Sequence, residues 1–191
     1  MFIKEAKIYL TGFMTSGKST IGPILANVLG LNFYDLDKEI ERIENRTIVE
    51  IFQQKGEKYF RDLESRILSK LAMEKGVVIS LGGGTIISPH NFVLMKKTGT
   101  IVYLRVSTET LYKRLKNKID RPLFRDLVLS EKNEKEFLRR IEEVLNNRKK
   151  FYEQADIIID SEDRPIGITV DELAKAIKES YNEKNQRTST R

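Results

Sequence analysis

The chain has 191 residues, of which 40% are hydrophobic and 32% charged, the size and balance of one compact globular domain. It contains no cysteine, which excludes disulfides, thiolate metal sites and cysteine nucleophiles, and its single histidine, His90, argues against a histidine-based metal site. The net charge of +6 comes from Lys and Arg that are interleaved with Glu, so it favours small anionic ligands over nucleic acid.

Short strands alternate with helices through the first half of the chain. The elements expected there, in chain order, are a strand at 8–10, a helix at 21–29, a strand at 31–34, helices at 38–44, 47–54 and 57–74, and a strand at 77–80. Gly30 is placed to end the first helix, and Thr47 with Glu50 fits a capping box at the start of the third.

The second half continues the alternation. The elements expected there are a helix from Ser88-Pro89, a strand at 100–104, a helix at 107–116, a charged loop at 117–130, a long helix to about residue 153, a strand at 156–160 and a helix at 170–181. The polar tail at 182–191 is expected to fray. Alternating strands and helices imply a parallel sheet covered on both faces, so residues 1–181 are predicted to form a single α/β domain with five strands.

Neither a membrane segment nor an export signal is indicated. No apolar stretch approaches the ~20 residues that cross a bilayer. Residues 1–7 carry charges where a signal peptide has its apolar core, so a cytoplasmic location is expected.

A phosphate-binding loop, called the phosphate loop below, occupies residues 12–19, with the sequence GFMTSGKS. It matches G-x-x-x-x-G-K-[ST] in full, and it follows a strand and opens a helix, which is the context in which this motif binds nucleotides. Backbone N–H groups of the loop would surround phosphate oxygens, Lys18 would reach the β- and γ-phosphates, and Ser19 would ligate Mg²⁺. The sequence has no guanine-reading N/T-K-x-D motif, so ATP is favoured over GTP.

Two acids, Asp35 and Asp37, follow the second strand, and three glycines, Gly82 to Gly84, follow the third. The carboxyl ends of parallel strands line the ligand crevice, so one acid could support Mg²⁺ and the other could orient or deprotonate a second substrate. The alternative is that both acids only cap the next helix. Many proteins with this loop hold Mg²⁺ with an acid at the end of another strand. Glycine at position 82 therefore favours a functional role for Asp35 and Asp37.

These residues together resemble the shikimate kinase family, whose members are phosphate-loop enzymes similar to nucleoside monophosphate kinases. The resemblance covers roughly residues 7–160. The matching pieces are residues 12–20, Asp35-Leu36-Asp37, Ile51-Phe52, Gly56-Glu57, Phe60-Arg61-Asp62-Leu63-Glu64, Gly82-Gly83-Gly84, Arg121-Pro122-Leu123, and Arg148 with Tyr152. Their joint occurrence in this order is specific, although no piece after the phosphate loop is decisive alone.

The resemblance implies a three-layer P-loop kinase fold with a substrate-binding segment at about 35–62 and a mobile lid at about 117–130. The implied reaction is transfer of a phosphoryl group from ATP to the 3-hydroxyl of shikimate, which gives shikimate 3-phosphate and ADP in aromatic amino-acid biosynthesis. Shikimate and ATP would be its small-molecule partners, and family resemblance suggests a monomer that binds neither nucleic acid nor membrane.

The resemblance also implies residue roles. The nucleotide-binding residues would be Gly12, Met14, Thr15, Ser16, Gly17, Lys18, Ser19, Thr20, Arg114 and Arg121. The shikimate-binding residues would be Asp37, Arg61, Gly82, Gly83, Gly84 and Arg148. Lys18, Asp37 and Arg121 would be catalytic, with Asp37 accepting the proton of the attacked hydroxyl and Arg121 arriving with the lid. Ser19 and Asp35 would hold Mg²⁺, directly or through water. Arg61 and Arg148 would bind the substrate carboxylate, and the glycines would let substrate approach their N–H groups.

Simpler interpretations remain open for several of these residues. Arg61 could form a helical pair with Glu64, Arg148 could lie in a surface salt bridge, and Arg121 could be an ordinary loop residue. Arg114 could be solvated rather than near adenine, and the glycines, Gly82 most of all, could form a flexible turn.

Position 15 departs from the family pattern. Thr15 stands where the family usually has glycine, so it would be strained if the backbone there has positive φ. The enzymatic alternatives are a gluconate kinase or a nucleoside monophosphate kinase, and the alternative outside enzymes is a nucleotide-binding regulatory module. The paired acids, triple glycine and lid arginine argue against all three.

Overall fold

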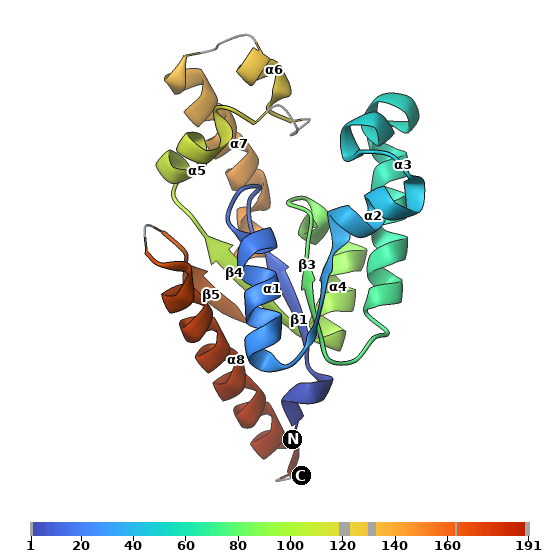
Figure 1. Cartoon of the computed structure of the whole chain (residues 1–191), viewed down its shortest axis with the longest axis vertical. Coiled ribbons are helices and arrows are strands. Elements are labelled where there is room, and N and C mark those ends of the chain that lie inside the picture. Colours follow the sequence, from blue (N-terminus) through green and yellow to red (C-terminus); the bar gives the residue numbers. More distant parts are fainter. Residues whose placement is uncertain (1, 119–122, 130–132, 163, 190–191) are drawn as a thin grey trace.

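Five parallel strands form one sheet with helices on both faces in the computed structural model, which describes residues 2–118, 123–129, 133–162 and 164–189 (Figure 1). The strands are β1 (Lys7–Thr11), β2 (Asn32–Asp35), β3 (Val77–Ser80), β4 (Thr100–Arg105) and β5 (Ile157–Asp160). They lie in the order β2-β3-β1-β4-β5, so β1 is central and its carboxyl end is flanked by those of β3 and β4. The predicted α/β fold class with a five-stranded parallel sheet is confirmed.

The inner strands are almost entirely buried because helices cover both of their faces. Every residue of β3 is buried, as are the last four residues of β1 and the first five of β4. Such strands show no alternation of polar and apolar residues. The continuous apolar runs in the sequence therefore identified the inner strands.

The helices are α1 (Lys18–Leu29), α2 (Leu36–Glu44), α3 (Ile48–Leu71), α4 (Pro89–Thr98), α5 (Thr108–Leu115), α6 (Arg125–Leu129), α7 (Glu134–Tyr152) and α8 (Ile166–Ser189), with short 3-10 turns η1 (Phe2–Glu5) and η2 (Thr85–Ile87). Helices α1 and α8 share one hydrophobic cluster with the sheet, and α3, α4 and α7 share another on the opposite face. A third cluster joins Phe13 of the phosphate loop to α5, α6 and α7.

The element boundaries differ most from expectation in three places. Helix α6 lies within a segment that was expected to be a loop, where Leu127 packs in the third cluster. Helix α8 begins at Ile166 and continues through Ser189, so it includes residues that were expected to fray. The two helices predicted on either side of Gly56 are one element with a kink, because Gly56 has φ 79° and ψ 167°. The capping box of Thr47 and Glu50 at the start of α3 is confirmed.

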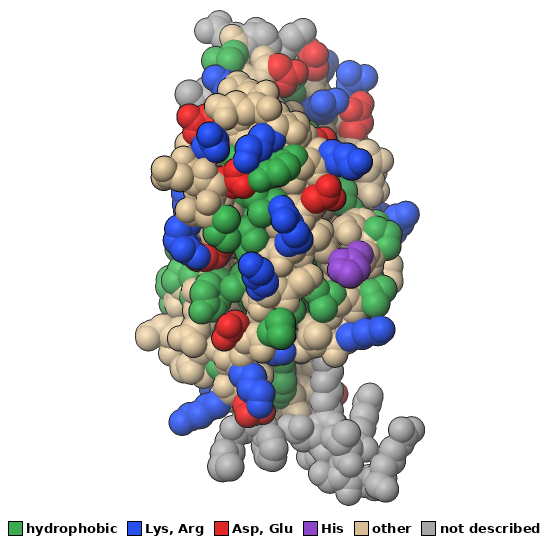
Figure 2. All heavy atoms as spheres, turned by 90° about the vertical axis from the view of Figure 1, so that its right-hand side faces the viewer, with side chains coloured by type: hydrophobic (Ala, Val, Ile, Leu, Met, Phe, Trp, Pro, Cys, Tyr) green, Lys and Arg blue, Asp and Glu red, His purple; other side chains and the backbone are tan. Residues whose placement is uncertain are grey.

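Figure 2 shows the face formed by α3 and α4, where basic, acidic and apolar side chains are interspersed rather than gathered by kind. His90 is exposed on this face, as expected near the start of a helix. Among the described residues, no helix combines the length and the apolar character that a membrane span requires.

Candidate active site

The phosphate loop connects the end of central strand β1 to the start of α1, as predicted. Gly12 has φ 149°, and a Cβ there would lie 2.7 Å from the Leu104 carbonyl oxygen. Gly17, the N-cap of α1, has φ 103°. Both positions lie in a backbone region that favours glycine, so the two glycines of the motif allow the chain to turn tightly into the helix. The N-terminus of α1 thereby opens toward the cavity described below.

Lys18 lies inside the curve of this loop, with 7% of its surface exposed. Its Nζ donates to the carbonyl oxygens of Gly12 at 2.9 Å and Phe13 at 2.8 Å. The loop backbone thus holds the ammonium group at the wall of the cavity, in a position to contact a phosphate oxygen of a bound nucleotide.

Thr15 has φ 62°, so its backbone has the left-handed conformation that was expected to strain a threonine at this position. That conformation costs a residue with a side chain about 1–2 kcal/mol. The Thr15 carbonyl accepts a hydrogen bond of 3.2 Å from Nη1 of Arg114 on α5, while its buried hydroxyl has no partner among the described residues. Arg114 therefore contacts the nucleotide loop itself, and its approach to adenine stays a prediction.

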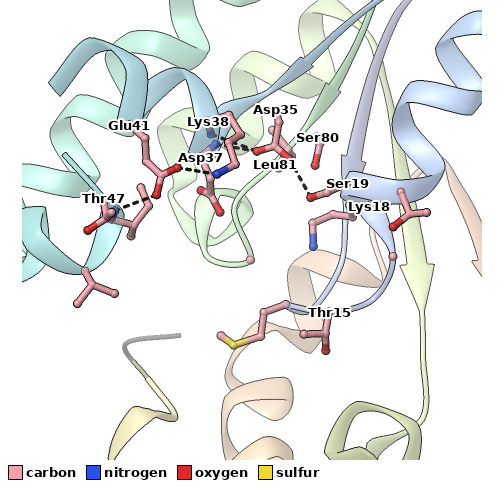
Figure 3. Close-up of a pocket in the computed structure, with 16 residues that line it drawn as sticks. Thr15, Lys18, Ser19, Asp35, Asp37, Lys38, Glu41, Thr47, Ser80 and Leu81 are labelled. Carbon is pink, nitrogen blue, oxygen red and sulfur yellow. Dashed lines mark hydrogen bonds and ion pairs between the residues drawn. The ribbon is translucent and has the colours of Figure 1, made fainter. Parts of the chain in front are cut away.

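Asp35 caps the next helix, as the simpler interpretation expected, and it also contacts the phosphate loop. Its Oδ1 caps α2 by accepting from the backbone N–H groups of Asp37 at 3.1 Å and Lys38 at 3.3 Å. Its Oδ2 accepts a hydrogen bond of 2.8 Å from the hydroxyl of Ser19 (Figure 3). One carboxylate thus fixes the start of α2 and presents an oxygen beside the phosphate loop.

The Ser19 hydroxyl and the Asp35 carboxylate are hard oxygen ligands, which suit Mg²⁺. Mg²⁺ in nucleotide enzymes usually keeps several waters and takes few protein ligands besides phosphate. The described residues contain no group of three or more His, Cys, Asp or Glu that could hold a metal ion. The two residues fit the ion that the phosphate loop implies.

A cavity of about 520 Å³ lies between the phosphate loop, the end of β3, α2 and the start of α3. Lys18 and Asp37 lie on opposite sides of it (Figure 3). The lining residues are Met14, Thr15, Gly17, Lys18, Ser19, Thr20, Asp35, Asp37, Lys38, Glu41, Thr47, Ile48, Val49, Ser80, Leu81 and Gly83. The structure thus brings most of the predicted nucleotide site together with Asp37.

The three glycines after β3 make room for three of the predicted substrate-binding side chains. A Cβ at Gly82 would lie 2.8 Å from Oδ1 of Asp37, one at Gly83 would lie 3.1 Å from Nη1 of Arg148, and one at Gly84 would lie 2.8 Å from Nη2 of Arg61. None of the three glycines has positive φ, so close approach rather than conformational freedom explains them. Gly82, which was expected to fit a flexible turn best, has the same packing reason as the others.

Arg61 and Arg148 line a second, smaller pocket of about 70 Å³, together with Asp37 and the glycines. Arg148 is 5% exposed and donates from Nη1 to the Gly83 carbonyl oxygen at 2.7 Å. Its guanidinium lies 5.7 Å from the centre of the Phe13 ring, and among the described residues it has no carboxylate at ion-pair distance. The interpretation of Arg148 as a surface salt bridge is therefore wrong, whereas Arg61 does form the expected pair with Glu64, at 3.0 Å.

Three residues of this site had no role assigned from the sequence. Tyr152 donates to the Gly83 carbonyl at 2.9 Å, and burial raises the pKa of its phenol, so it stays a donor. Glu64 and Thr85 lie buried behind Arg61. In the sequence, Tyr152 and Glu64 appeared only as members of family motifs. The one sequence signal for a role of Thr85 was its hydroxyl-bearing side chain directly after the three glycines. Arg121, the predicted lid arginine, lies outside the described residues.

Comparison with known proteins decides the family. The shikimate kinase family model matches residues 14–180. A curated shikimate kinase from Chloroherpeton thalassium is 43% identical over 175 residues, which cover 92% of this chain and 94% of that protein. The chain belongs to the shikimate kinase family. The crystal structure of shikimate kinase from Bacteroides thetaiotaomicron has a TM-score of 0.81 at 36% identity, covering 91% of this chain and 98% of that one.

Shikimate kinase from Acinetobacter baumannii, solved in complex with shikimate, has a TM-score of 0.80 at 32% identity and covers 96% of each chain. These shikimate kinases have the same five-stranded phosphate-loop fold along nearly the whole of this chain. The resemblance found in the sequence is therefore confirmed, and the fold is that of a shikimate kinase.

Proposed function

We propose that this protein transfers the γ-phosphoryl group of ATP to the 3-hydroxyl of shikimate, which yields shikimate 3-phosphate and ADP for aromatic amino-acid biosynthesis. Its family membership makes it a kinase. The observation that carries the acceptor assignment is Arg148, a buried guanidinium without a carboxylate partner among the described residues, which lines one pocket with Arg61 beside the phosphate loop. Two guanidinium groups in a small pocket suit a small monocarboxylate.

ATP would bind with its phosphates in the curve of the phosphate loop. The backbone N–H groups of residues 12–20 and the ammonium group of Lys18 would hold the β- and γ-phosphates. We propose that Ser19 and Asp35 hold Mg²⁺, directly or through water; when bound, it supplies positive charge against the phosphate oxygens. Arg114 would extend this site toward the nucleoside, and Arg121 would approach the transferring group when the lid closes.

Asp37 would act as general base toward the 3-hydroxyl. Support for this role comes from its position, since it lines both the larger cavity and the small pocket. A carboxylate at the junction of donor and acceptor sites can accept the hydroxyl proton as the oxygen attacks the phosphorus. Arg61 and Arg148 would orient the ring through its carboxylate, and the N–H groups of the glycines would contact its hydroxyls.

We further propose that the enzyme acts as a cytoplasmic monomer, with residues 35–62 as the segment that holds shikimate and about 117–130 as the lid. Its partners would then be the two small substrates alone. Sedimentation at micromolar concentration with and without both substrates would test the oligomeric state, and a dimer in either condition would contradict it.

The test is ADP release from ATP and Mg²⁺, with shikimate, gluconate and nucleoside monophosphates offered separately. We expect turnover with shikimate alone and a loss of at least about 100-fold in kcat for Asp37→Asn, which keeps the shape but not the base. No turnover with shikimate would overturn the assignment. Turnover with another acceptor would identify a different kinase, and ATP binding without any turnover would indicate a regulatory module.

A further inference from the structure

Glu64 of α3 is a buried carboxylate whose two oxygens have different donors. It is 1% exposed. Its Oε2 accepts from Nη1 of Arg61 at 3.0 Å, and its Oε1 accepts from the hydroxyl of Thr85 at 2.6 Å. A buried carboxylate needs such donors because it has lost its contact with water. The Thr85 hydroxyl thus takes one oxygen of the carboxylate, and the other oxygen accepts from Arg61.

The backbone of Thr85 is itself fixed by hydrogen bonds. It is fully buried, its N–H donates to the Gly82 carbonyl at 3.1 Å, and its own carbonyl accepts from Nδ2 of Asn91 at 3.1 Å. Asn91 is also fully buried, on α4. Because this backbone is fixed, the position of the Thr85 hydroxyl is fixed as well. Its hydrogen bond to Glu64 links the turn after the glycines to α3.

Arg61 depends on Glu64 more than on its other carboxylate partner, Glu57. Its Nε and Nη2 each lie 3.3 Å from Oε1 of Glu57, whose side chain is 59% exposed. Exposed ion pairs contribute little because water screens them. The buried oxygen of Glu64, together with the surface of Gly84 beneath the guanidinium, therefore sets the position of Arg61.

We propose that Thr85 is a positioning residue for shikimate, because its hydroxyl orients the buried Glu64 carboxylate that aligns the Arg61 guanidinium with the carboxylate of the substrate. This inference rests on the proposed function. Thr85 does not line the small pocket; it acts on substrate binding through Glu64, which does line that pocket and accepts a hydrogen bond from it.

The experiment is steady-state kinetics of Thr85→Val, which keeps the branched shape and removes the hydroxyl. We expect the KM for shikimate to rise about tenfold, since a hydrogen bond to a charged group is lost. The KM for ATP should stay within about twofold, because Thr85, Glu64 and Arg61 do not line the cavity beside the phosphate loop. Thr85→Ser keeps the hydroxyl and should restore the KM for shikimate. If the valine variant does not fold, Thr85→Ala carries the same expectation.

Two further variants separate positioning from general damage. Glu57→Gln, the matched control, removes the negative charge of the exposed partner of Arg61 and should leave the KM for shikimate within about twofold. In an Arg61→Gln background, Thr85→Val should have no further effect, because the residue through which it acts is gone. An additive effect there, an unchanged KM in the single variant, or an equal rise for both substrates would overturn the inference. If the wild-type protein fails to phosphorylate shikimate, the proposed function fails first.

Discussion

Substitution of Gly84 by alanine tests whether the glycines exist to accommodate the arginines. A Cβ at this position would lie 2.8 Å from Nη2 and 2.9 Å from Nη1 of Arg61. Ordinary contact begins at 3.4 Å, so the guanidinium would have to move by about 0.6 Å. Misplacement of a binding group by about 1 Å can cost about 100-fold in rate, so we expect a rise of about tenfold in the KM for shikimate. The KM for ATP should not change.

The fold should tolerate this substitution. Gly84 has φ −107° and ψ −6°, which alanine adopts freely, and the atoms that must move are the end of a flexible side chain. The loss in unfolding free energy should stay below about 1 kcal/mol, or about 2–4 °C in Tm. Gly167→Ala is the matched control, because its Cβ would meet nothing within 4 Å. Unchanged shikimate kinetics for Gly84→Ala, or an equal effect on ATP, would refute the packing argument.

Three further predictions each concern the substitution of a single residue. Thr15→Gly should raise the unfolding free energy by about 1 kcal/mol in urea denaturation, because it relieves a left-handed threonine; a loss of stability would contradict this. Arg148→Met should raise the KM for shikimate by about 10- to 100-fold with the KM for ATP unchanged, and wild-type shikimate kinetics would refute the role of this guanidinium. Burial, reinforced by the neighbouring Tyr152, raises the pKa of Tyr103 to about 12 from the usual 10.0. The stability that this shift represents is present below pH 10 and lost as the pH rises toward 12, so Tyr103→Phe should reduce the loss measured by denaturation across that range.

Local signals were enough to locate the elements and the phosphate loop. Strand β3 was predicted at the residues where it lies, because a short apolar run there is followed closely by three glycines. The capping box at Thr47 depends on two residues three positions apart. The phosphate loop is equally local, since its glycines, lysine and serine all lie within residues 12–19. Such features can be predicted because the interacting groups are neighbours in sequence.

Features that depend on distant contacts could not be predicted. Helix α6 is five residues long and charged at its start, and it is held by burial of Leu127 against distant aromatic residues. The reason for Gly83 is a guanidinium 65 positions later in the chain. The resemblance to a family predicted that Arg148 matters, but only the packing explains why no side chain is present opposite it.

The Gly83 carbonyl, which accepts hydrogen bonds from both Arg148 and Tyr152, also bears on how the protein is made. During synthesis the phosphate loop, Asp37 and the glycines emerge early. Helix α7, which carries Arg148 and Tyr152, is the second-to-last helix to emerge. Domains fold as their residues become available, so a nascent chain that ends before residue 152 would lack the contacts that complete this pocket. Premature termination of synthesis within α7 would therefore release a polypeptide that contains the phosphate loop but cannot complete its acceptor pocket.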